Sequence, residues 1–459
     1  MAGWKRPLRV RARLEDSKPL SGLIDRRRLL AGAGAAWVAA GLGARIAQAD
    51  DATVAGTKSA RPVQLRCWFM GHEAEFVAPL LPEFERRNPG ITVAIQQVPW
   101  TAAHEKLLTA FAADGLPDLC NLGNTWIPEF AALNALEPLD AYIAASQVVA
   151  PLDYFPGIWD TNRMDGAVLG IPWYVDTRLL FYRRDLLAQA GFDHPPSTWN
   201  EWARMLAAVK TNAGPGRYAT LLPLNEFPPL LALALQQAEP LLRDGGRRGN
   251  FSNDGFRRTL SFYVEMFRRG WAPMLTYSQI PNPWAEFGRG FFTFYISGPW
   301  NIEEFQHRLP AELSHAWTTA PLPGPDGPGA SSAGGTSLVI FRFARHKDAV
   351  WRLIEYLSEP ATQIRFHQLT GDLPPRRSAW RDPQLSANEY AKAFREQLER
   401  VKPTPKVPEW ENIVNQMQEM AAQVVAGRFS VDAGTQELDR RVDATLEKRR
   451  WMLDRRHTV

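Results

Sequence analysis

Tryptophans dominate the side chains that could contact a ligand. The chain has 17 of them, and Trp4 and Trp37 are the two that precede residue 50. Several others stand at the ends of predicted strands or in loops, namely Trp100, Trp126, Trp173, Trp284 and Trp300. An aromatic ring placed there can stack on the apolar C–H face of a sugar, although it could equally pack a core. The pattern favours a site for a neutral, sugar-like ligand.

Polar groups that could bond the hydroxyls of such a ligand follow the same strand ends. His72 and Glu73 end the first predicted strand, and Asp176 and Arg178 follow a later one. A buried polar group left unpaired costs about 1–3 kcal/mol, so such groups reject wrong ligands. The alternatives are a solvated loop at His72 and Glu73, and a structural ion pair between Asp176 and Arg178. Weaker candidates are Thr125, Asn225, Glu226, Gly334, Gly335, Thr336 and Arg376.

Signatures of catalysis and of metal binding are absent from the sequence. We find no nucleophile elbow, phosphate-binding loop, dinucleotide fingerprint, zinc-protease motif or CxxC pair. An exported carbohydrate-active enzyme stays open as an alternative, because Glu73 and Asp176 could face one cleft. We expect neither a cofactor nor a metal. Cys67 and Cys120 fall in predicted core strands, where they could pair but are more often small core residues.

The N-terminus carries the basic charge and resembles an export leader. Residues 1–49 hold ten of the 53 Lys and Arg but three of the 49 Asp and Glu, so the remainder is slightly acidic. A nucleic-acid-binding body should be basic, so that class is disfavoured. Arg26 and Arg27 open a twin-arginine motif, an apolar run follows, and Ala47-Gln-Ala49 predicts cleavage before Asp50. We expect a periplasmic protein with a linker at 50–61.

The first part of the body alternates strands and helices. Strands are predicted at 62–70, 91–95 and 117–122, with helices at 74–88 and 101–114 between them. This order is the signature of a wound, parallel α/β sheet. Ligands bind beyond the carboxyl ends of strands in such sheets. The site is therefore predicted where His72, Trp100 and Trp126 lie.

The rest of the chain is more helical. Helices are expected at 199–210, with Thr198 as N-cap, and at 253–269, 347–358, 361–369 and from about 386 to 454. Strands are expected at 291–296 and 337–341. Proline-rich stretches at 321–329 and 374–375 break the pattern and mark surface loops or crossovers.

The order of several segments resembles the solute-binding proteins of bacterial carbohydrate importers, including the maltose type. The resemblance covers about 62–450. It is carried by segments 124–133, 136–140, 170–178, 180–187, 195–199, 287–290, 297–300, 320–324 and 334–335. It implies an α/β fold of two lobes, 62–171 with 322–373 and 177–317 with 376–459. The hinge crossings would lie near 171–177, 317–322 and 373–376, and closure of the lobes would trap the ligand.

The resemblance also implies roles for particular residues. Trp300 occupies the position of a sugar-stacking ring, Trp410 that of another, and Asp176 that of a hydroxyl-binding carboxylate. Partners would be a small carbohydrate and the permease of an ABC importer, and we expect a monomer. Gly71-His72-Glu73 and Thr125-Trp126 depart from the charged pairs of the maltose type, so maltodextrin specificity is not implied. A polyol phosphate, polyamine or other solute stays open as the ligand.

Overall fold

The computed structural model of the protein describes residues 62–456. The predicted leader at 1–49, its cleavage before Asp50 and the linker at 50–61 lie outside the described residues. Among the helices of 62–456, none combines the length and apolar character that a membrane crossing requires. The body is built on two mixed sheets, each flanked by helices.

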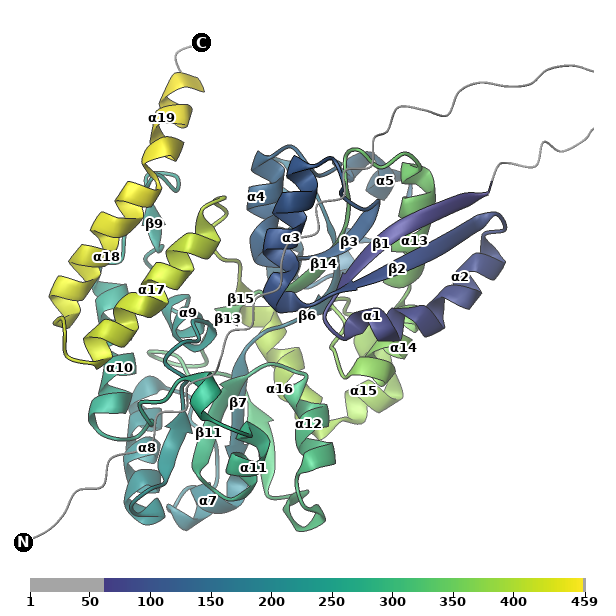
Figure 1. Cartoon of the computed structure of the whole chain (residues 1–459). Helices are drawn as coiled ribbons and strands as arrows, with labels where there is room; N and C mark the ends of the chain where they lie inside the picture. The colour runs from purple at the N-terminus through teal and green to yellow at the C-terminus, as the bar shows by residue number, and fades with distance from the viewer. Residues whose placement is uncertain (1–61, 457–459) are drawn as a thin grey trace, which may run out of the picture. The chain divides into compact units, whose positions relative to one another are not determined.

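The first sheet has five strands. In spatial order they are β2 (Ile91–Val98), β1 (Val63–Met70), β3 (Leu119–Gly123), β14 (Gly335–Ile340) and β6 (Ile171–Val175) (Figure 1). β1 runs parallel to β2 and β3, as the alternation of strands and helices predicted. β14 runs antiparallel to β3 and β6, so the sheet as a whole is mixed.

The two faces of this sheet bury different residues, because successive side chains of a strand point to opposite faces. Cys67 of β1 belongs to a core with α1 (Glu73–Val77), α2 (Leu81–Arg87), α13 (Lys347–Ser358) and α14 (Pro360–Thr370). Cys120 of β3 belongs to a core with α3 (Trp100–Ala112) and α4 (Ile127–Ala132) on the other face. Both cysteines are buried and free, and the sheet separates them. We call this sheet and these helices the first lobe.

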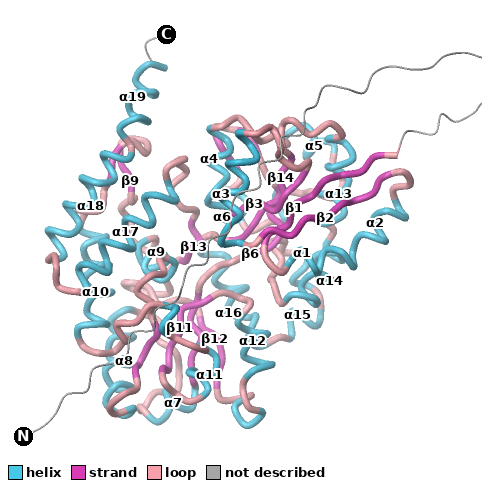
Figure 2. Tube along the Cα trace, viewed as in Figure 1, coloured by secondary structure: helices cyan, strands magenta, loops and turns pink. Residues whose placement is uncertain are grey.

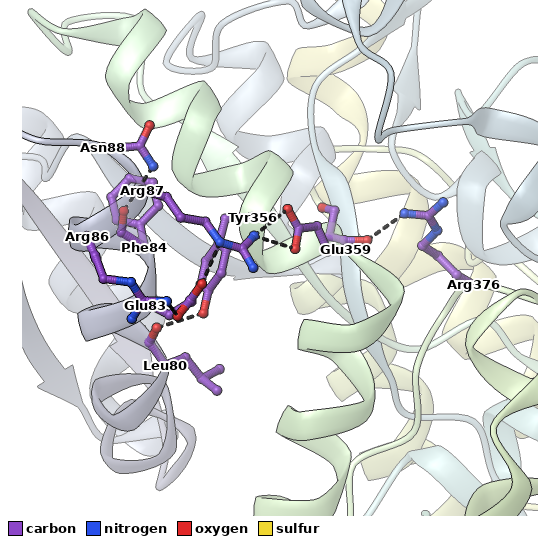
Figure 3. A network of polar contacts seen from close by, with 10 residues as sticks. Leu80, Glu83, Phe84, Arg86, Arg87, Asn88, Tyr356, Glu359 and Arg376 are labelled. Atoms are coloured by element: carbon purple, nitrogen blue, oxygen red, sulfur yellow. Dashed lines mark hydrogen bonds and ion pairs between the residues drawn. The ribbon is translucent and has the colours of Figure 1, made fainter.

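An ion-pair network joins α2 to the end of α13 in the first lobe. The Arg87 guanidinium contacts Glu83 at 2.6 Å and Glu359 at 3.0 Å, and it lies over the Tyr356 ring (Figure 3). The Tyr356 hydroxyl donates a hydrogen bond to the Leu80 carbonyl at 2.8 Å. The ion pairs are largely exposed, so each stabilises the fold by about 1 kcal/mol or less.

The second sheet has four strands. In spatial order they are β12 (Trp317–Ala320), β7 (Leu179–Arg183), β11 (Phe292–Ser297) and β8 (Tyr218–Leu221). Figure 2 labels β11 and β12 of this sheet. Leu180 and Phe294 pack on one face with α8 (Trp199–Ala213), α9 (Pro228–Ala234), α10 (Asp254–Arg268), α17 (Trp410–Val425) and α18 (Val431–Thr445). Phe181 and Tyr295 pack on the other face with α12 (Asn301–Arg308) and α16 (Glu389–Gln397). This sheet and its helices form the second lobe.

Side-chain caps explain where two of the long helices of the second lobe begin. The Thr198 hydroxyl accepts the Glu201 N–H at 3.1 Å, which confirms the predicted cap of α8. The Asn253 side chain accepts the Phe256 N–H at 2.8 Å and starts α10. Such caps stabilise a helix by about 1 kcal/mol.

The remaining elements are α5 (Asp140–Ala145), α6 (Pro156–Asp160), α7 (Arg184–Gln189), α11 (Pro283–Gly288), α15 (Pro383–Ala387) and α19 (Glu447–Arg456), with β4 (Arg163–Met164), β5 (Ala167–Val168), β9 (Leu242–Arg243), β10 (Arg248–Gly249), β13 (Ser331–Ser332) and β15 (Val401–Lys402).

Three connections between the sheets lie side by side. The Val175 N–H donates to the Leu373 carbonyl at 3.0 Å, and the Asp176 N–H donates to the Gly334 carbonyl at 3.1 Å. The first connection leads from β6 to β7, and the third contains Leu373. The second begins after Ala320, because 317–320 is a strand of the second sheet. The exact lobe boundaries stay a prediction.

One early segment packs against the second sheet. Phe155 and Ile158 belong to the same core as Phe181 and Phe394, although both precede the first predicted crossing. Phe155 also lies edge-on to Trp380, with ring centroids 6.4 Å apart. The chain therefore enters the core of the second lobe before it completes the first sheet.

Candidate functional site

A cavity of about 830 Å³ is lined by residues of both lobes. The first lobe contributes residues that follow β1, β3 and β6 and the start of β14. The second lobe contributes the beginning of α9 and the segment around Trp300. The carboxyl ends of the parallel strands β1 and β3 lie at one edge of the first sheet, which is where the sequence predicted the site.

Most of the predicted site residues line this cavity. They are His72, Glu73, Thr125, Trp126, Asp176, Arg178, Trp300, Gly334, Gly335 and Thr336. Trp284, Asn225 and Glu226 line a second, adjoining cavity of about 270 Å³. The two cavities share Arg178, Phe227, Pro228 and Trp300, so these residues lie at their boundary.

Trp300 is held by a turn that requires glycine. The turn Ser297-Gly-Pro-Trp300 follows β11 and leads into α12. A Cβ atom at Gly298 would overlap the indole ring of Trp300, so the ring packs directly on the backbone of that glycine. The Arg178 guanidinium lies over the ring, 4.5 Å from its centroid. The indole is thus positioned from two sides at the boundary of the cavities.

Arg178 and Asp176 form an ion pair in the wall of the cavity. The guanidinium is 3.4 Å from Asp176 Oδ2, with the side chains 17% and 32% exposed. Asp176 Oδ1 is buried and has no hydrogen-bond partner. Burial raises the pKa of Asp176, and the charge of Arg178 opposes that rise. The ion pair is the arrangement expected of a structural pair, and both residues also line the cavity.

A second group of carboxyls surrounds the start of α1. The Tyr174 hydroxyl donates to Glu73 Oε1 at 2.8 Å. Burial raises the pKa of Glu73, against hydrogen bonds that lower it. Burial also raises the pKa of Asp372 well above its usual range, and the charges of Glu73 and Asp176 raise it further. The wall of the cavity is therefore rich in acceptor groups and poor in compensating cations.

Two aromatic rings pack against Trp126 in the first-lobe wall of the cavity. The Thr125 hydroxyl donates to Glu411 Oε1 at 2.6 Å, which links the first lobe to α17 of the second. The Trp126 ring lies 5.6 Å from the Trp100 ring and 5.1 Å from the His104 ring. A hydrogen bond to Glu129 raises the pKa of His104. Trp100 and Trp126 thus form an aromatic pair at one side of the cavity.

The smaller cavity has an ordered polar wall. The Trp284 indole N–H donates to Asn301 Oδ1 at 2.6 Å, and the Asn301 amide donates to the Ser297 hydroxyl at 2.5 Å. Asn225 Oδ1 accepts the Tyr277 backbone N–H at 2.7 Å. These bonds orient the side chains before any ligand arrives.

Three predicted site residues do not line either cavity. Trp173 is 2% exposed and packs 4.4 Å from Phe366, because β6 is covered on both faces. Trp410 is fully buried, because it begins the apolar face of α17. Arg376 is 6% exposed and donates to Asp153 at 2.7 Å. It also donates to the Ser358 carbonyl at 2.6 Å, beside Glu359 in Figure 3. All three are buried away from both cavities.

Several cavity residues were missed by the sequence analysis. Tyr174 lies between the predicted Trp173 and Asp176, and Glu411 follows the predicted Trp410, so proximity in sequence was an available signal. Asp372 precedes the proline pair of the third connection, where no local pattern indicates a ligand contact. The others are Glu75, Phe76, Leu231, Glu303, Glu304, Ser332, Ala333, Leu369, Thr370 and Thr404.

The arrangement is suited to binding a hydroxylated ligand. Aromatic rings are present at both walls, and carboxylate, hydroxyl and amide groups lie between them. Within 62–456, no group of three or more His, Cys, Asp or Glu side chains is placed to hold a metal ion. The side chains that line the cavity can bind a ligand by stacking and by hydrogen bonding.

Comparisons with known proteins agree with this geometry. Residues 71–364 match the family described as bacterial extracellular solute-binding protein. The solved sugar-binding protein MalE of Xanthomonas citri is 57% identical, with a TM-score of 0.83, over 85% of this chain and 99% of that chain. The diacetylchitobiose-binding protein DasA of Streptomyces coelicolor is 23% identical over 90% of this chain and 97% of its own length. A binding protein of Brucella abortus is 25% identical over 80% of this chain and 88% of its own length.

Proposed function

Since this chain belongs to the bacterial extracellular solute-binding protein family, we propose that it captures a carbohydrate in the larger cavity and delivers it to the permease of an ABC importer. The observation that carries the proposal is the boundary position of Trp300, with Asp176 and Arg178 beside it. The likeness to a sugar-binding protein at 57% identity supports the ligand class.

The physical argument rests on complementary surfaces. A pyranose ring has apolar faces that an indole can cover, and hydroxyls that a carboxylate oxygen can accept. The Asp176 side chain lines the cavity and is 32% exposed, so its carboxylate can accept a ligand hydroxyl, and a hydrogen bond to a charged group contributes about 1.5–3 kcal/mol. A neutral solute without hydroxyls would not make that hydrogen bond. The site therefore favours polyhydroxylated ligands.

Capture would use the connections between the lobes. Three of them run side by side, and the ligand contacts come from both lobes, so closure around the ligand would bury it. The Thr125–Glu411 hydrogen bond is a contact that closure brings together. We further propose export by the twin-arginine route, cleavage before Asp50 and action as a monomer in the periplasm.

The acidity of the cavity favours a second candidate, a cationic solute of the polyamine type. Its carboxyl groups are Glu73, Glu75, Asp176, Glu303, Glu304, Asp372 and Glu411, whereas its basic groups are His72 and Arg178. Polyamines are recognised by acids between aromatic walls. A carbohydrate would offer hydroxyls to the site, whereas a polyamine would offer positive charge. A single ligand screen therefore separates the two candidates.

The test is thermal unfolding in the presence of a panel of mono- and oligosaccharides, with spermidine as the cationic arm. A ligand present at 100 times its Kd stabilises the protein by about 2.7 kcal/mol. We expect a sugar to raise the melting temperature and to be recovered unchanged. Stabilisation by spermidine but by no sugar would refute the carbohydrate proposal.

The site is tested by Trp300→Ala, which removes the stacking ring. We expect the ligand-induced shift to vanish while circular dichroism stays that of the parent. Trp451→Ala is the matched control, because Trp451 is 55% exposed and lies outside the cavities. Equal loss of binding in both variants would count against the assigned site.

A further inference from the structure

The last helix of the described chain differs in charge from the rest of the body. α19 contains five Lys and Arg residues and two acidic residues in ten positions, with the sequence EKRRWMLDRR. Residues 62–446 contain 36 Lys and Arg against 42 Asp and Glu, so the body is acidic. α19 stands at the C-terminal, yellow end of the chain (Figure 1). A basic helix on an acidic body concentrates the positive charge at one end.

One face of α19 combines exposed apolar and basic side chains. Lys448, Trp451, Met452 and Arg455 occupy positions i, i+3, i+4 and i+7, which share a face of a helix. Trp451 is 55% exposed and Met452 is 42% exposed, and both are among the exposed large hydrophobic side chains of the described residues. The Arg455 guanidinium lies over the Trp451 ring, 3.9 Å from its centroid. We call these four residues the α19 stripe.

Other residues of the helix attach it to the second lobe. Arg450 donates hydrogen bonds to the Asp443 carbonyl at 2.8 Å and to the Arg247 carbonyl at 3.1 Å. Asp454 forms an ion pair with Arg247 in the turn between β9 and β10. These contacts fix the rotation of α19 about its own axis. The stripe is consequently left for an outside partner.

We propose that the α19 stripe docks on an anionic phospholipid surface. Indole and thioether side chains insert into the headgroup region of a bilayer, and flanking Lys and Arg pair with its phosphates. The charge of the remaining body selects this orientation, because an anionic surface repels the acidic part and attracts α19. Reversible contact of this kind holds the protein close to a membrane without a membrane-spanning segment.

The test is co-sedimentation of the full chain with vesicles of phosphatidylcholine alone or mixed with phosphatidylglycerol. We expect binding to the mixed vesicles, weakened by salt, and no comparable binding to phosphatidylcholine alone. Lys448→Glu with Arg455→Glu should weaken binding by at least about 30-fold, since each basic residue near such a surface contributes roughly fivefold. Trp451→Ala with Met452→Ala should weaken it by about tenfold or more.

Matched controls change the same residue types elsewhere. Arg204→Glu with Lys392→Glu reverses two exposed charges, and Met274→Ala with Phe343→Ala removes two exposed apolar side chains. All variants share one N-terminus, so any binding through the leader is common to them. Equal binding of parent, stripe variants and controls would overturn the proposal. A self-association of the parent that the stripe variants lose, with unchanged vesicle binding, would overturn it in favour of a second copy as the partner.

Discussion

Replacing Arg178 by methionine tests the central ion pair of the site. Methionine keeps most of the apolar length of the side chain but removes the charge that faces Asp176 and the Trp300 ring. Asp176 then keeps a buried carboxylate with no cation beside it. We expect Arg178→Met to lower the free energy of unfolding even without ligand.

The magnitude follows from burial and distance. A fully buried pair costs about 3–5 kcal/mol when one partner is removed, and an exposed pair about 0–1 kcal/mol. Side chains that are 17% and 32% exposed lie between these limits, and the cation–π contact at 4.5 Å adds about 0.5–2 kcal/mol. We therefore expect a loss of about 2 kcal/mol.

The assay is urea unfolding of ligand-free protein near neutral pH. Arg184→Met is the control, because Arg184 pairs with Glu389 at 2.9 Å with both side chains 45% exposed. Its loss should stay within about 0.5 kcal/mol. The double variant Asp176→Asn with Arg178→Met should be about 1–2 kcal/mol more stable than the sum of the single changes predicts.

The pH dependence adds a second check on the same pair. The folded-state pKa of Asp176 is raised above its unfolded value, so stability is present at low pH and is lost as pH rises through the folded pKa. Removing Arg178 raises that pKa further, so the loss in Arg178→Met should grow between about pH 4 and about pH 8. A loss no larger than that of Arg184→Met, or strict additivity in the double variant, would refute the reasoning.

Three further changes probe other parts of the site. Gly298→Ala should weaken ligand affinity by about tenfold or more with the fold retained, because the new Cβ displaces the Trp300 ring. Titration calorimetry measures the affinity, and an unchanged value would contradict the packing of Trp300 on Gly298. Asp372→Asn should raise the free energy of unfolding more at about pH 8 than at about pH 5, because it removes a carboxyl whose folded-state pKa is raised. Urea midpoints report the gain in stability, and a larger gain at the lower pH would contradict the raised pKa of Asp372. Thr125→Val should weaken ligand affinity about fivefold to tenfold, because it removes the hydrogen bond to Glu411 that spans the lobes. Thr211→Val, on an exposed face of α8, is the control and should leave the affinity unchanged. Equal affinities of the two variants would show that the Thr125–Glu411 contact plays no part in ligand capture.

Local patterns predicted the first sheet well. Strands at 62–70, 91–95 and 117–122 appear as β1, β2 and β3, because alternating side chains and the intervening helices are encoded over short distances. The antiparallel β14 could not be oriented from sequence, since its neighbours β3 and β6 are far from it along the chain. The short strands β7 and β12 were not predicted as strands.

The sequence predicted those cavity residues that follow the end of a strand. It failed where the position of a residue depends on a contact that is distant along the chain. Trp300 and Trp173 look alike in sequence, but one follows a glycine turn and the other lies inside a strand covered on both faces. Arg376 was expected to contact ligand, yet its partner Asp153 is 223 residues away. Such pairings depend on the assembled fold, and no local spacing reveals them.

The packing of Phe155 and Ile158 limits how the protein can be divided. A split at the first crossing, 171–177, would leave both side chains on a fragment that lacks their core partners Phe181 and Phe394. Each fragment would then expose an apolar surface. The core of the separated second lobe would also have an empty space where Phe155 and Ile158 pack in the intact protein. We expect the lobes of this protein to be poor independent folding units, and exchanges of lobes between relatives to succeed only when the segment around 155–158 travels with the second lobe.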